Sequence, residues 1–370
     1  MARIKVAVLG TGVSASIFHF PYLEALPKQY ELYACWERRA TETYSKAKEK
    51  YPNIKVFTNV DELLADTAIE LVVVSLPPAC HEEIVTKALN AHKHVVCEKP
   101  FTETVEEAKK LFELADKVDR LLCVYQNRRW DGDYMTVKNL IESGRLGQIV
   151  EFESHFDRYS VSLGSKKSWK GELGYANGLL YGIGSHLIDQ AIALFGEPVG
   201  VTAKVMNQRQ FPPLGLDDYY YIVLHYSADN EQLPTEVILR STFVAPGYTP
   251  RFIVRGTKGT FVKEGFDPQE KQIAKGMKPD DPAYGKDHPD NYGSLWYTDD
   301  VVEPDIIKET VPTTIGDYRF FYRQIAKCIE NNDRSLTPVP PQHTLSVQRV
   351  ISASIQGSAS GESVTFDTHL

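Results

Sequence analysis

Short apolar runs alternate with helical patterns over the first third of the chain. The apolar runs predict strands at Lys5–Gly10, Leu32–Trp36, Leu71–Leu76, Val95–Glu98 and Leu121–Tyr125. Helical patterns lie between them, for example at Cys80–Asn90 and Val105–Asp116. Near-continuous Val and Leu strands separated by helices are typical of a parallel sheet covered on both faces. This part of the chain is therefore expected to be a doubly wound, Rossmann-type α/β domain, residues 1–125.

The pattern changes after Gly144–Gln148. Long alternating runs then predict strands at Ile149–Phe156, Val199–Asn207, Tyr219–Ser227, Thr235–Thr242, Phe252–Val254 and Gly259–Lys263. One apolar helix is expected at Ser185–Phe195, and the Asp-, Pro- and Gly-rich segment Gly265–Asp305 is expected to be loop. Helices at Ile315–Asn331 and His343–Ser358 close the chain. Residues 126–370 should thus form an α+β domain with a large, mainly antiparallel open sheet, and the last helices are free to pack back on the first domain.

Composition narrows the class of protein. The 370 residues are 42% hydrophobic and 24% charged, with a net charge of −8 and no Lys/Arg cluster, which argues against nucleic acid as a partner. No apolar stretch is long enough for a membrane span, and the chain enters its first strand without a secretory leader pattern. The five cysteines are scattered and lack metal-site spacing, so no metal is expected. These features favour a cytoplasmic enzyme.

A glycine turn follows the first predicted strand and opens a helix. It reads Gly10-Thr11-Gly12-Val13-Ser14-Ala15, a G-x-G-x-x-A form of the dinucleotide fingerprint. Gly10 allows the tight turn, Gly12 lets a pyrophosphate approach the backbone, and the small Ala15 lets helix and strand pack closely. Val13 and Ser14 lie at the helix N-terminus that would face the phosphates.

Two conflicting signals follow the second strand. Glu37 stands where an acid would accept from the ribose hydroxyls of NAD, but Arg38 and Arg39 come next and would suit the additional phosphate of NADP. A carboxylate facing that phosphate would repel it, so the choice depends on which side chain points inward. NADP is weakly favoured, and NAD remains open.

The string Val-Val-Cys-Glu98-Lys99-Pro100 ends another buried strand, at the edge of the sheet where ligands bind in open α/β folds. Together with the glycine turn it resembles the glucose–fructose oxidoreductase / inositol dehydrogenase / MocA family. The resemblance covers the whole chain and its pattern is closest to scyllo-inositol dehydrogenase members. It implies a nicotinamide cofactor, with Glu98 and Lys99 beside it and Lys99 bonding the substrate. The turn at Leu76 and Pro77, with His81 shortly after, would also contact the cofactor.

A second string in the predicted apolar helix, Gly184-Ser185-His186-Leu187-Ile188-Asp189, resembles the family's Gly-x-His-x-x-Asp pattern. The resemblance implies that His186 accepts the proton during alcohol oxidation, which suits an imidazole that titrates near neutrality. Many inositol dehydrogenases carry an aspartate four residues earlier, where this chain has Gly182. Tyr181 is therefore a candidate to assist, and Asp189 a candidate substrate contact.

Further contacts are expected at the ends of neighbouring strands. Asn127 is expected to contact the cofactor, and the candidate substrate-binding residues are Arg129, Asp157, Tyr159, Trp169 and Lys170. A polar pocket with one or two aromatic rings suits a polyol, whose hydroxyl groups need hydrogen-bond partners.

The sequence thus predicts an NAD(P)-dependent oxidoreductase that acts on a cyclic polyol or sugar. Alternatives are a dihydrodiol dehydrogenase-like enzyme and a non-catalytic nucleotide-binding sugar sensor acting as a transcriptional co-repressor. The alternating apolar positions Tyr219, Tyr221 and Val223 leave one face of the open sheet uncovered, which predicts a homodimer or a dimer of dimers packed through that face.

Overall fold

The structure, a computed structural model, describes residues 3–161, 174–211, 214–227, 234–247 and 249–366. The chain divides into two compact units. The first takes its described residues from Met1–Trp130, Gln269–Gly285 and Asp317–Leu345. The second takes them from Asp131–Pro268, Lys286–Gly316 and Ser346–Leu370.

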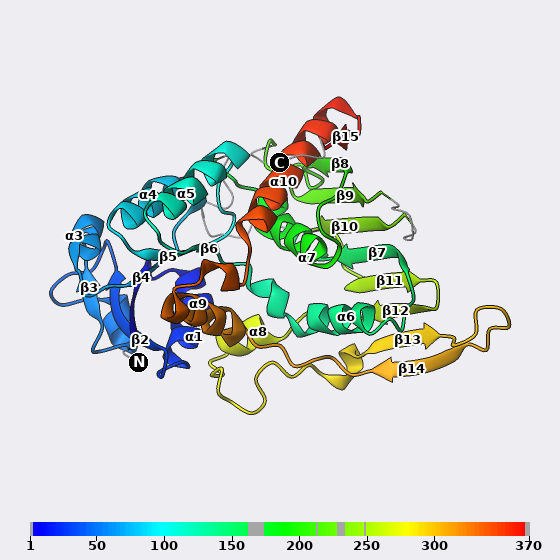
Figure 1. Cartoon of the computed structure of the whole chain (residues 1–370), viewed down its shortest axis with the longest axis horizontal. Helices are drawn as coiled ribbons and strands as arrows, with labels where there is room; N and C mark the ends of the chain where they lie inside the picture. Colours follow the sequence, from blue (N-terminus) through cyan, green and yellow to red (C-terminus); the bar gives the residue numbers. More distant parts are fainter. Residues whose placement is uncertain (1–2, 162–173, 212–213, 228–233, 248, 367–370) are drawn as a thin grey trace. The chain divides into compact units, whose positions relative to one another are not determined.

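The first unit is built on a parallel sheet with the strand order β3-β2-β1-β4-β5-β6 (Figure 1). Its strands are β1 (Ile4–Leu9), β2 (Tyr30–Trp36), β3 (Lys55–Phe57), β4 (Leu71–Val74), β5 (His94–Cys97) and β6 (Leu122–Val124). Its helices are α1 (Phe20–Glu24), α2 (Lys46–Lys50), α3 (Val60–Ala65), α4 (His81–Asn90), α5 (Val105–Lys117), α8 (Gln269–Ala274) and α9 (Arg319–Asn331). Short helical turns η1 (Ala15–His19), η2 (Pro78–Cys80), η3 (Asn127–Trp130) and η7 (Arg334–Leu336) complete it.

Both faces of this sheet are buried, as the near-continuous apolar strands require. All four residues of β4 are buried. Val72 and Val74 pack in one core with residues of α3, α4 and α5, whereas Val73 packs on the opposite side with α1 and α9. Helix α5 begins where the sequence places it, with Thr104 and Glu107 forming a reciprocal capping box.

The second unit is built on a nine-stranded sheet of order β14-β13-β12-β11-β7-β10-β9-β8-β15. The strands are β7 (Ile149–His155), β8 (Gly200–Met206), β9 (Tyr219–His225), β10 (Glu236–Thr242), β11 (Phe252–Gly256), β12 (Gly259–Lys263), β13 (Gly293–Tyr297), β14 (Ile307–Val311) and β15 (Val364–Thr365). The β7–β10 pair is parallel and the other pairs are antiparallel. The unit also contains α6 (Gly132–Glu142), α7 (Ser185–Phe195), the turns η5 (Leu180–Gly184) and η6 (Pro289–Asn291), and most of α10 (Pro341–Ser360).

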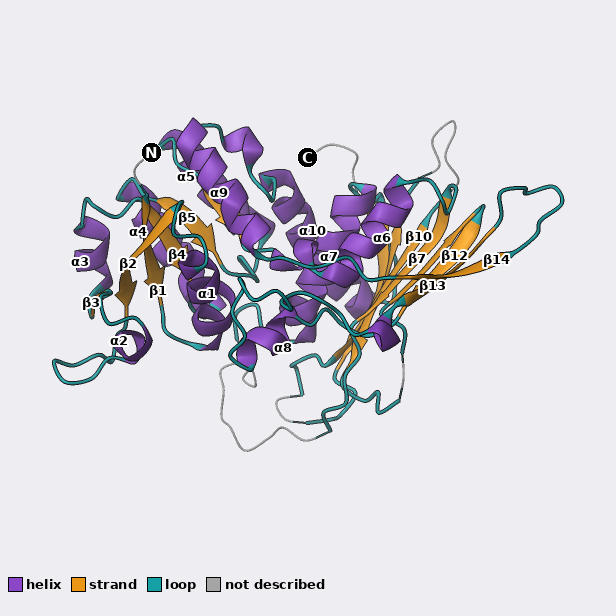
Figure 2. Cartoon of the chain, turned by 90° about the horizontal axis from the view of Figure 1, so that it is seen from below, coloured by secondary structure: helices purple, strands orange, loops and turns teal. Residues whose placement is uncertain are grey.

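Helices α6, α7 and α10 pack on one face of this sheet, where alternate strand residues such as Ile222 and Leu224 are fully buried. The opposite face carries no helix among the described residues (Figure 2). Tyr221 on that face is 36% exposed. The predicted fold class, a Rossmann sheet followed by an α+β domain with a large open sheet, is confirmed.

The expectation that Gly265–Asp305 is loop was wrong in part. The segment contains α8 and β13, and β13 pairs with β12 and β14. A five-residue strand between Asp-, Pro- and Gly-rich stretches shows little alternation, and it is stabilised by main-chain bonds to neighbours distant in sequence. The three-residue strand β3 was not predicted for the same reason.

Candidate functional site: the carboxyl edge of the parallel sheet and the start of α7

The glycine turn has the shape that the fingerprint requires. Gly10 has φ +109°, and a Cβ there would lie 2.6 Å from the carbonyl oxygen of Ser75 at the end of β4. Apart from its two chain neighbours, no described residue has an atom within 4 Å of a Cβ built on Gly12, so the backbone is open to an approaching group. Val13 is 73% exposed beside it, and Ala15 is fully buried against the sheet. The turn therefore leaves room for a pyrophosphate on its outer side.

Glu37 is turned toward the protein. Its carboxylate accepts hydrogen bonds from Ser45 Oγ at 2.7 Å, Lys46 N at 2.9 Å and Ala47 N at 3.2 Å, at the start of α2. Burial acts to raise the pKa of Glu37, but these bonds outweigh it and leave the pKa lowered. Arg38 is exposed. The acid thus caps a helix, a role that the sequence spacing did not suggest.

Cations stand close to the same turn. Arg39 is exposed like its neighbour Arg38. Lys46 Nζ donates to the carbonyl oxygen of Thr11 in the glycine turn at 2.7 Å. Lys46, Lys50 and Thr11 line one cavity together with Tyr51 and Phe20.

The end of β4 holds one polar atom with no hydrogen-bond partner. Ser75 Oγ is buried and unpaired, next to the predicted cofactor contacts Leu76 and the exposed Pro77. His81 is fully buried, with Nε2 3.0 Å from the carbonyl oxygen of Leu76 and Nδ1 3.0 Å from that of Phe101. Burial lowers the pKa of His81. His81 therefore links the turn after β4, through Leu76, to the segment after β5, through Phe101.

Glu98 is the most heavily bonded residue of the predicted set. It is 6% exposed, and its carboxylate accepts from Ser14 Oγ, from His19 Nε2 at 3.0 Å and from Lys99 N at 3.0 Å. Burial acts to raise its pKa, yet the hydrogen bond and the electrostatic influence of His19, together with the charge of Lys99 and the Ser14 bond, lower the pKa of Glu98 to about 2. Glu98 therefore joins the glycine turn to the strand end that carries Lys99.

After β6, Asn127 and Arg129 differ in their hydrogen bonding. Asn127 is 4% exposed and its Nδ2 has no hydrogen-bond partner. A buried donor of this kind is available to a bound ligand. Arg129 donates to the carbonyl oxygen of Pro338 at 3.1 Å and lies 3.0 Å from His343 Nδ1. Its guanidinium thus ties together segments of the first unit. The unpaired atoms of Ser75 and Asn127, with the open Gly12, show that this edge fits a nicotinamide dinucleotide.

In the second unit, Tyr181, His186 and Asp189 lie on one helical segment, η5 followed by α7, and all three are buried. Asp217 supports the start of this segment, because its Oδ2 accepts from Leu180 N at 2.7 Å. Burial, only partly offset by bonds from backbone N–H groups, raises the pKa of Asp217 to about 6. Apart from its chain neighbours and the adjoining backbone of its own helix, no described residue has an atom within 4 Å of a Cβ built on Gly182.

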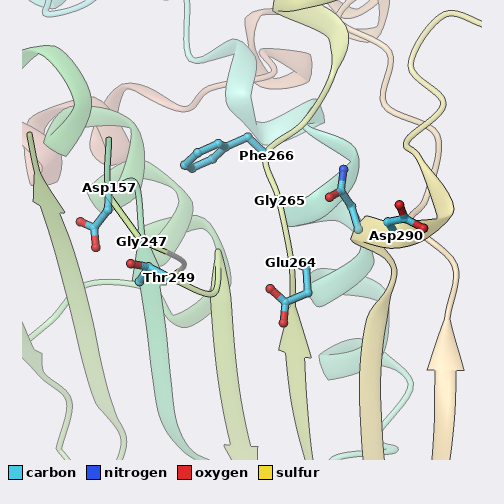
Figure 3. Close-up of a pocket in the computed structure, with 8 residues that line it drawn as sticks. Asp157, Gly247, Thr249, Glu264, Gly265, Phe266 and Asp290 are labelled. Atoms are coloured by element: carbon cyan, nitrogen blue, oxygen red, sulfur yellow. The ribbon is translucent and has the colours of Figure 1, made fainter. Parts of the chain in front are cut away.

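Asp157 lines an acidic cavity of about 560 Å³ (Figure 3). The cavity is bordered by Asp157, Gly247, Thr249, Glu264, Gly265, Phe266, Asp290 and Asn291. Neither carboxylate oxygen of Asp157 has a hydrogen-bond partner, although Arg240 Nη2 lies 3.7 Å from Oδ2. Burial raises the pKa of Glu264. The carboxylates of this lining can accept hydrogen bonds from the hydroxyl groups of a ligand, and their negative charge disfavours an anionic ligand.

The remaining predicted substrate contacts divide in two. Tyr159 is 58% exposed and bridges by its backbone to Val244. Trp169 and Lys170 lie outside the described residues.

The sequence argument missed His19, Ser45, Lys46 and Tyr322, which hold the predicted residues in place. A histidine inside the apolar stretch after the glycine turn was the one visible signal. Among the described residues no group of three or more His, Cys, Asp or Glu side chains could hold a metal ion. Nor is any described helix long and apolar enough to cross a bilayer.

Comparisons with known proteins agree with this geometry. Residues 4–126 match the family model "Oxidoreductase family, NAD-binding Rossmann fold", and residues 138–366 match "Oxidoreductase family, C-terminal alpha/beta domain". The chain is 57% identical to the uncharacterized oxidoreductase C115.03 of Schizosaccharomyces pombe, over 98% of this chain and all of that protein. It is 37% identical to the scyllo-inositol 2-dehydrogenase (NADP(+)) IolW of Bacillus subtilis, over 96% and 94% of the two chains. The solved structure of the oxidoreductase yvaA from Bacillus subtilis superposes with a TM-score of 0.90 at 36% identity, covering 98% of each chain.

Proposed function

Because the chain belongs to the Gfo/Idh/MocA oxidoreductase family, we propose that it transfers a hydride between NADP and a hydroxyl-bearing carbon of a cyclic polyol or sugar. The observation that carries the proposal is the hydrogen bonding of Ser14, in the glycine turn, to Glu98, the residue before Lys99. It joins the dinucleotide site to a cationic side chain at the same sheet edge. The relative IolW, whose name specifies scyllo-inositol and NADP, supports both the substrate class and the cofactor.

The proposed roles follow from the chemistry of each side chain. The nicotinamide ring, when bound, supplies or accepts the hydride. Lys99 donates a hydrogen bond to the reacting oxygen, and His186 takes the hydroxyl proton during oxidation. Gly182 stands where many inositol dehydrogenases carry an aspartate, and Tyr181 assists the proton transfer by His186 in its place. Asp189 contacts substrate.

Further groups complete the proposed binding sites. Gly10, Gly12, Val13 and Ser14 bind the pyrophosphate region, with Leu76, Pro77 and Asn127 along the rest of the cofactor. Asp157 accepts from substrate hydroxyl groups, and its acidic cavity favours a neutral polyol over a phosphorylated or carboxylated sugar. Arg129, Tyr159, Trp169 and Lys170 remain candidate substrate contacts.

The preference for NADP over NAD rests on Glu37. Its carboxylate is committed to the start of α2 by three hydrogen bonds. It is therefore a poor acceptor for ribose hydroxyls. The exposed guanidinium groups of Arg38 and Arg39 are the groups that suit a 2′-phosphate.

The test is turnover with inositols and aldoses, using both cofactors, by wild type and Lys99→Ala. Lys110→Ala, which removes the same charge from an exposed position on α5, is the matched control. Lys99→Ala should lower kcat/KM by about 10²–10⁴, the usual contribution of acid–base groups, while Lys110→Ala stays near wild type. Equal rates for wild type and Lys99→Ala would remove Lys99 from the reaction. Absence of turnover with the whole panel would favour a binding protein.

Two properties of the whole protein are part of the proposal. The uncovered sheet face with Tyr221 would pack against a second copy, which gives a homodimer or a dimer of dimers. A cytoplasmic location agrees with the five free cysteines, four of which are buried.

A further inference from the structure

Three side chains of the first unit form a buried chain of hydrogen bonds that ends at Glu98. Tyr322 on α9 lies with its hydroxyl 2.6 Å from His19 Nδ1, and His19 Nε2 lies 3.0 Å from Glu98 Oε1. Tyr322 and His19 are fully buried, and Glu98 is 6% exposed. Tyr322 and His19 are 303 positions apart in sequence, and these hydrogen bonds link both of them to the strand end that carries Lys99.

The donors and acceptors assign the protons along this chain. Burial raises the pKa of Tyr322 well above its usual value, so its hydroxyl keeps the proton and is a hydrogen-bond partner of His19 Nδ1. Because the Glu98 carboxylate can only accept, His19 Nε2 carries a hydrogen and donates it to Glu98. Ser14 Oγ donates to the same carboxylate, as does the backbone N–H of Lys99.

The position and charge of the Glu98 carboxylate affect the neighbouring Lys99. A carboxylate that moved or took up a proton would change both the field and the backbone position at Lys99, because Lys99 N bonds to Glu98 Oε2. The Tyr322 hydroxyl holds the imidazole at Nδ1, so that the Nε2 hydrogen stays directed at the carboxylate. This hydrogen bond from His19 favours the charged form of Glu98 beside Lys99.

We propose that His19 and Tyr322 are positioning residues for the reaction, holding Glu98 ionised and fixed so that Lys99 keeps its charge and place. This inference rests on the proposed function of Lys99. Neither His19 nor Tyr322 need touch cofactor or substrate. Their effect should appear in kcat and in its pH dependence rather than in KM.

The test uses Tyr322→Phe with Tyr30→Phe as a matched control. Tyr30 is also buried, and its hydroxyl donates to the backbone oxygen of Tyr322 at 2.6 Å, so the control removes a comparable hydroxyl bond without touching His19. Tyr322→Phe should lower kcat about tenfold, leave KM and the Kd for NADP within about threefold, and move the alkaline limb of the pH–rate profile to lower pH. A tenfold loss of kcat corresponds to about 1.4 kcal/mol in the activation free energy. Tyr30→Phe should keep the wild-type rate and profile.

A second pair of variants separates donation from packing. His19→Gln keeps an N–H donor for Glu98 and should retain more turnover than His19→Phe, which fills the space without donating. Equal losses in His19→Gln and His19→Phe, or equal losses in Tyr322→Phe and Tyr30→Phe, would reduce the chain to a structural role and overturn the proposal.

One readout does not need a substrate. The ¹⁵N spectrum of histidine side chains should show His19 with a hydrogen on Nε2 in the wild type, and Tyr322→Phe should shift the Nδ1 resonance, because Nδ1 loses its hydrogen-bond partner. An Nε2 without a hydrogen in the wild type would overturn the inference. If no polyol is turned over, the proposed function fails while this spectrum still decides the hydrogen-bond chain.

Discussion

Replacing Glu37 by alanine distinguishes two accounts of cofactor choice. If the carboxylate faced the adenosine ribose, its removal would weaken NAD and relieve repulsion of NADP. The structure instead has it capping α2 through Ser45, Lys46 and Ala47. Its removal should therefore loosen the segment beside the glycine turn and weaken both cofactors together.

The size of the effect follows from the cap. Substituting a capping residue by alanine costs about 0.5–2 kcal/mol. Because Ser45 and Ala47 are themselves buried, we expect the upper end of that range. About 2 kcal/mol corresponds to at most about 30-fold in the Kd of either cofactor. Arg38→Ala should behave differently, since losing one charge-assisted bond of about 1.5–3 kcal/mol weakens NADP by about 10- to 150-fold and leaves NAD nearly unchanged.

Titration calorimetry with NADP⁺ and NAD⁺ at one fixed ionic strength measures these constants. Glu42→Ala is the control, since it removes an exposed carboxylate from the same segment. A Glu37→Ala protein that bound NADP more tightly than wild type would refute the capping account. The lowered pKa of Glu37 adds a check on stability. Its stabilising contribution is present above the unfolded-state value of about 4.3 and is lost as the pH falls through the folded-state pKa, so wild type and Glu37→Ala should converge in acid.

Three further outcomes are expected. His186→Asn should lower kcat/KM by about 10²–10⁴ and remove the acid limb of the pH–rate profile; a retained acid limb would contradict its role as proton acceptor. Asp217, with its pKa raised to about 6 by burial, should contribute stability that is fully present below the unfolded-state value of about 3.9 and is lost as the pH rises through about 6; Asp217→Asn should remove this component of the slope in thermal melts between about pH 4 and 7. Small-angle scattering should give a dimeric or tetrameric mass that Tyr221→Glu lowers, and a monomeric wild type would count against packing through the open sheet.

Local signals in the sequence determined the architecture and indicated the candidate site residues. Apolar strands without alternation specify burial on both faces, so the parallel sheet could be predicted before any contact was known. The glycine turn and Glu98-Lys99-Pro100 each follow such a strand. Parallel strands place their carboxyl ends at one edge, which brings these two strings together. Alternation after Ile149 likewise specified a sheet buried on one side only.

The tertiary structure decided which groups those residues contact. Glu37 stands at the position of a ribose-binding acid, but residues eight to ten positions later supply the donors that it accepts from. Glu98 is held by His19 and, through it, by Tyr322 at the far end of the chain. Periodicity and spacing report on neighbours within a turn or a strand. The partner of a buried polar group is chosen by which distant segment packs against it, and that information exists only once the chain has folded.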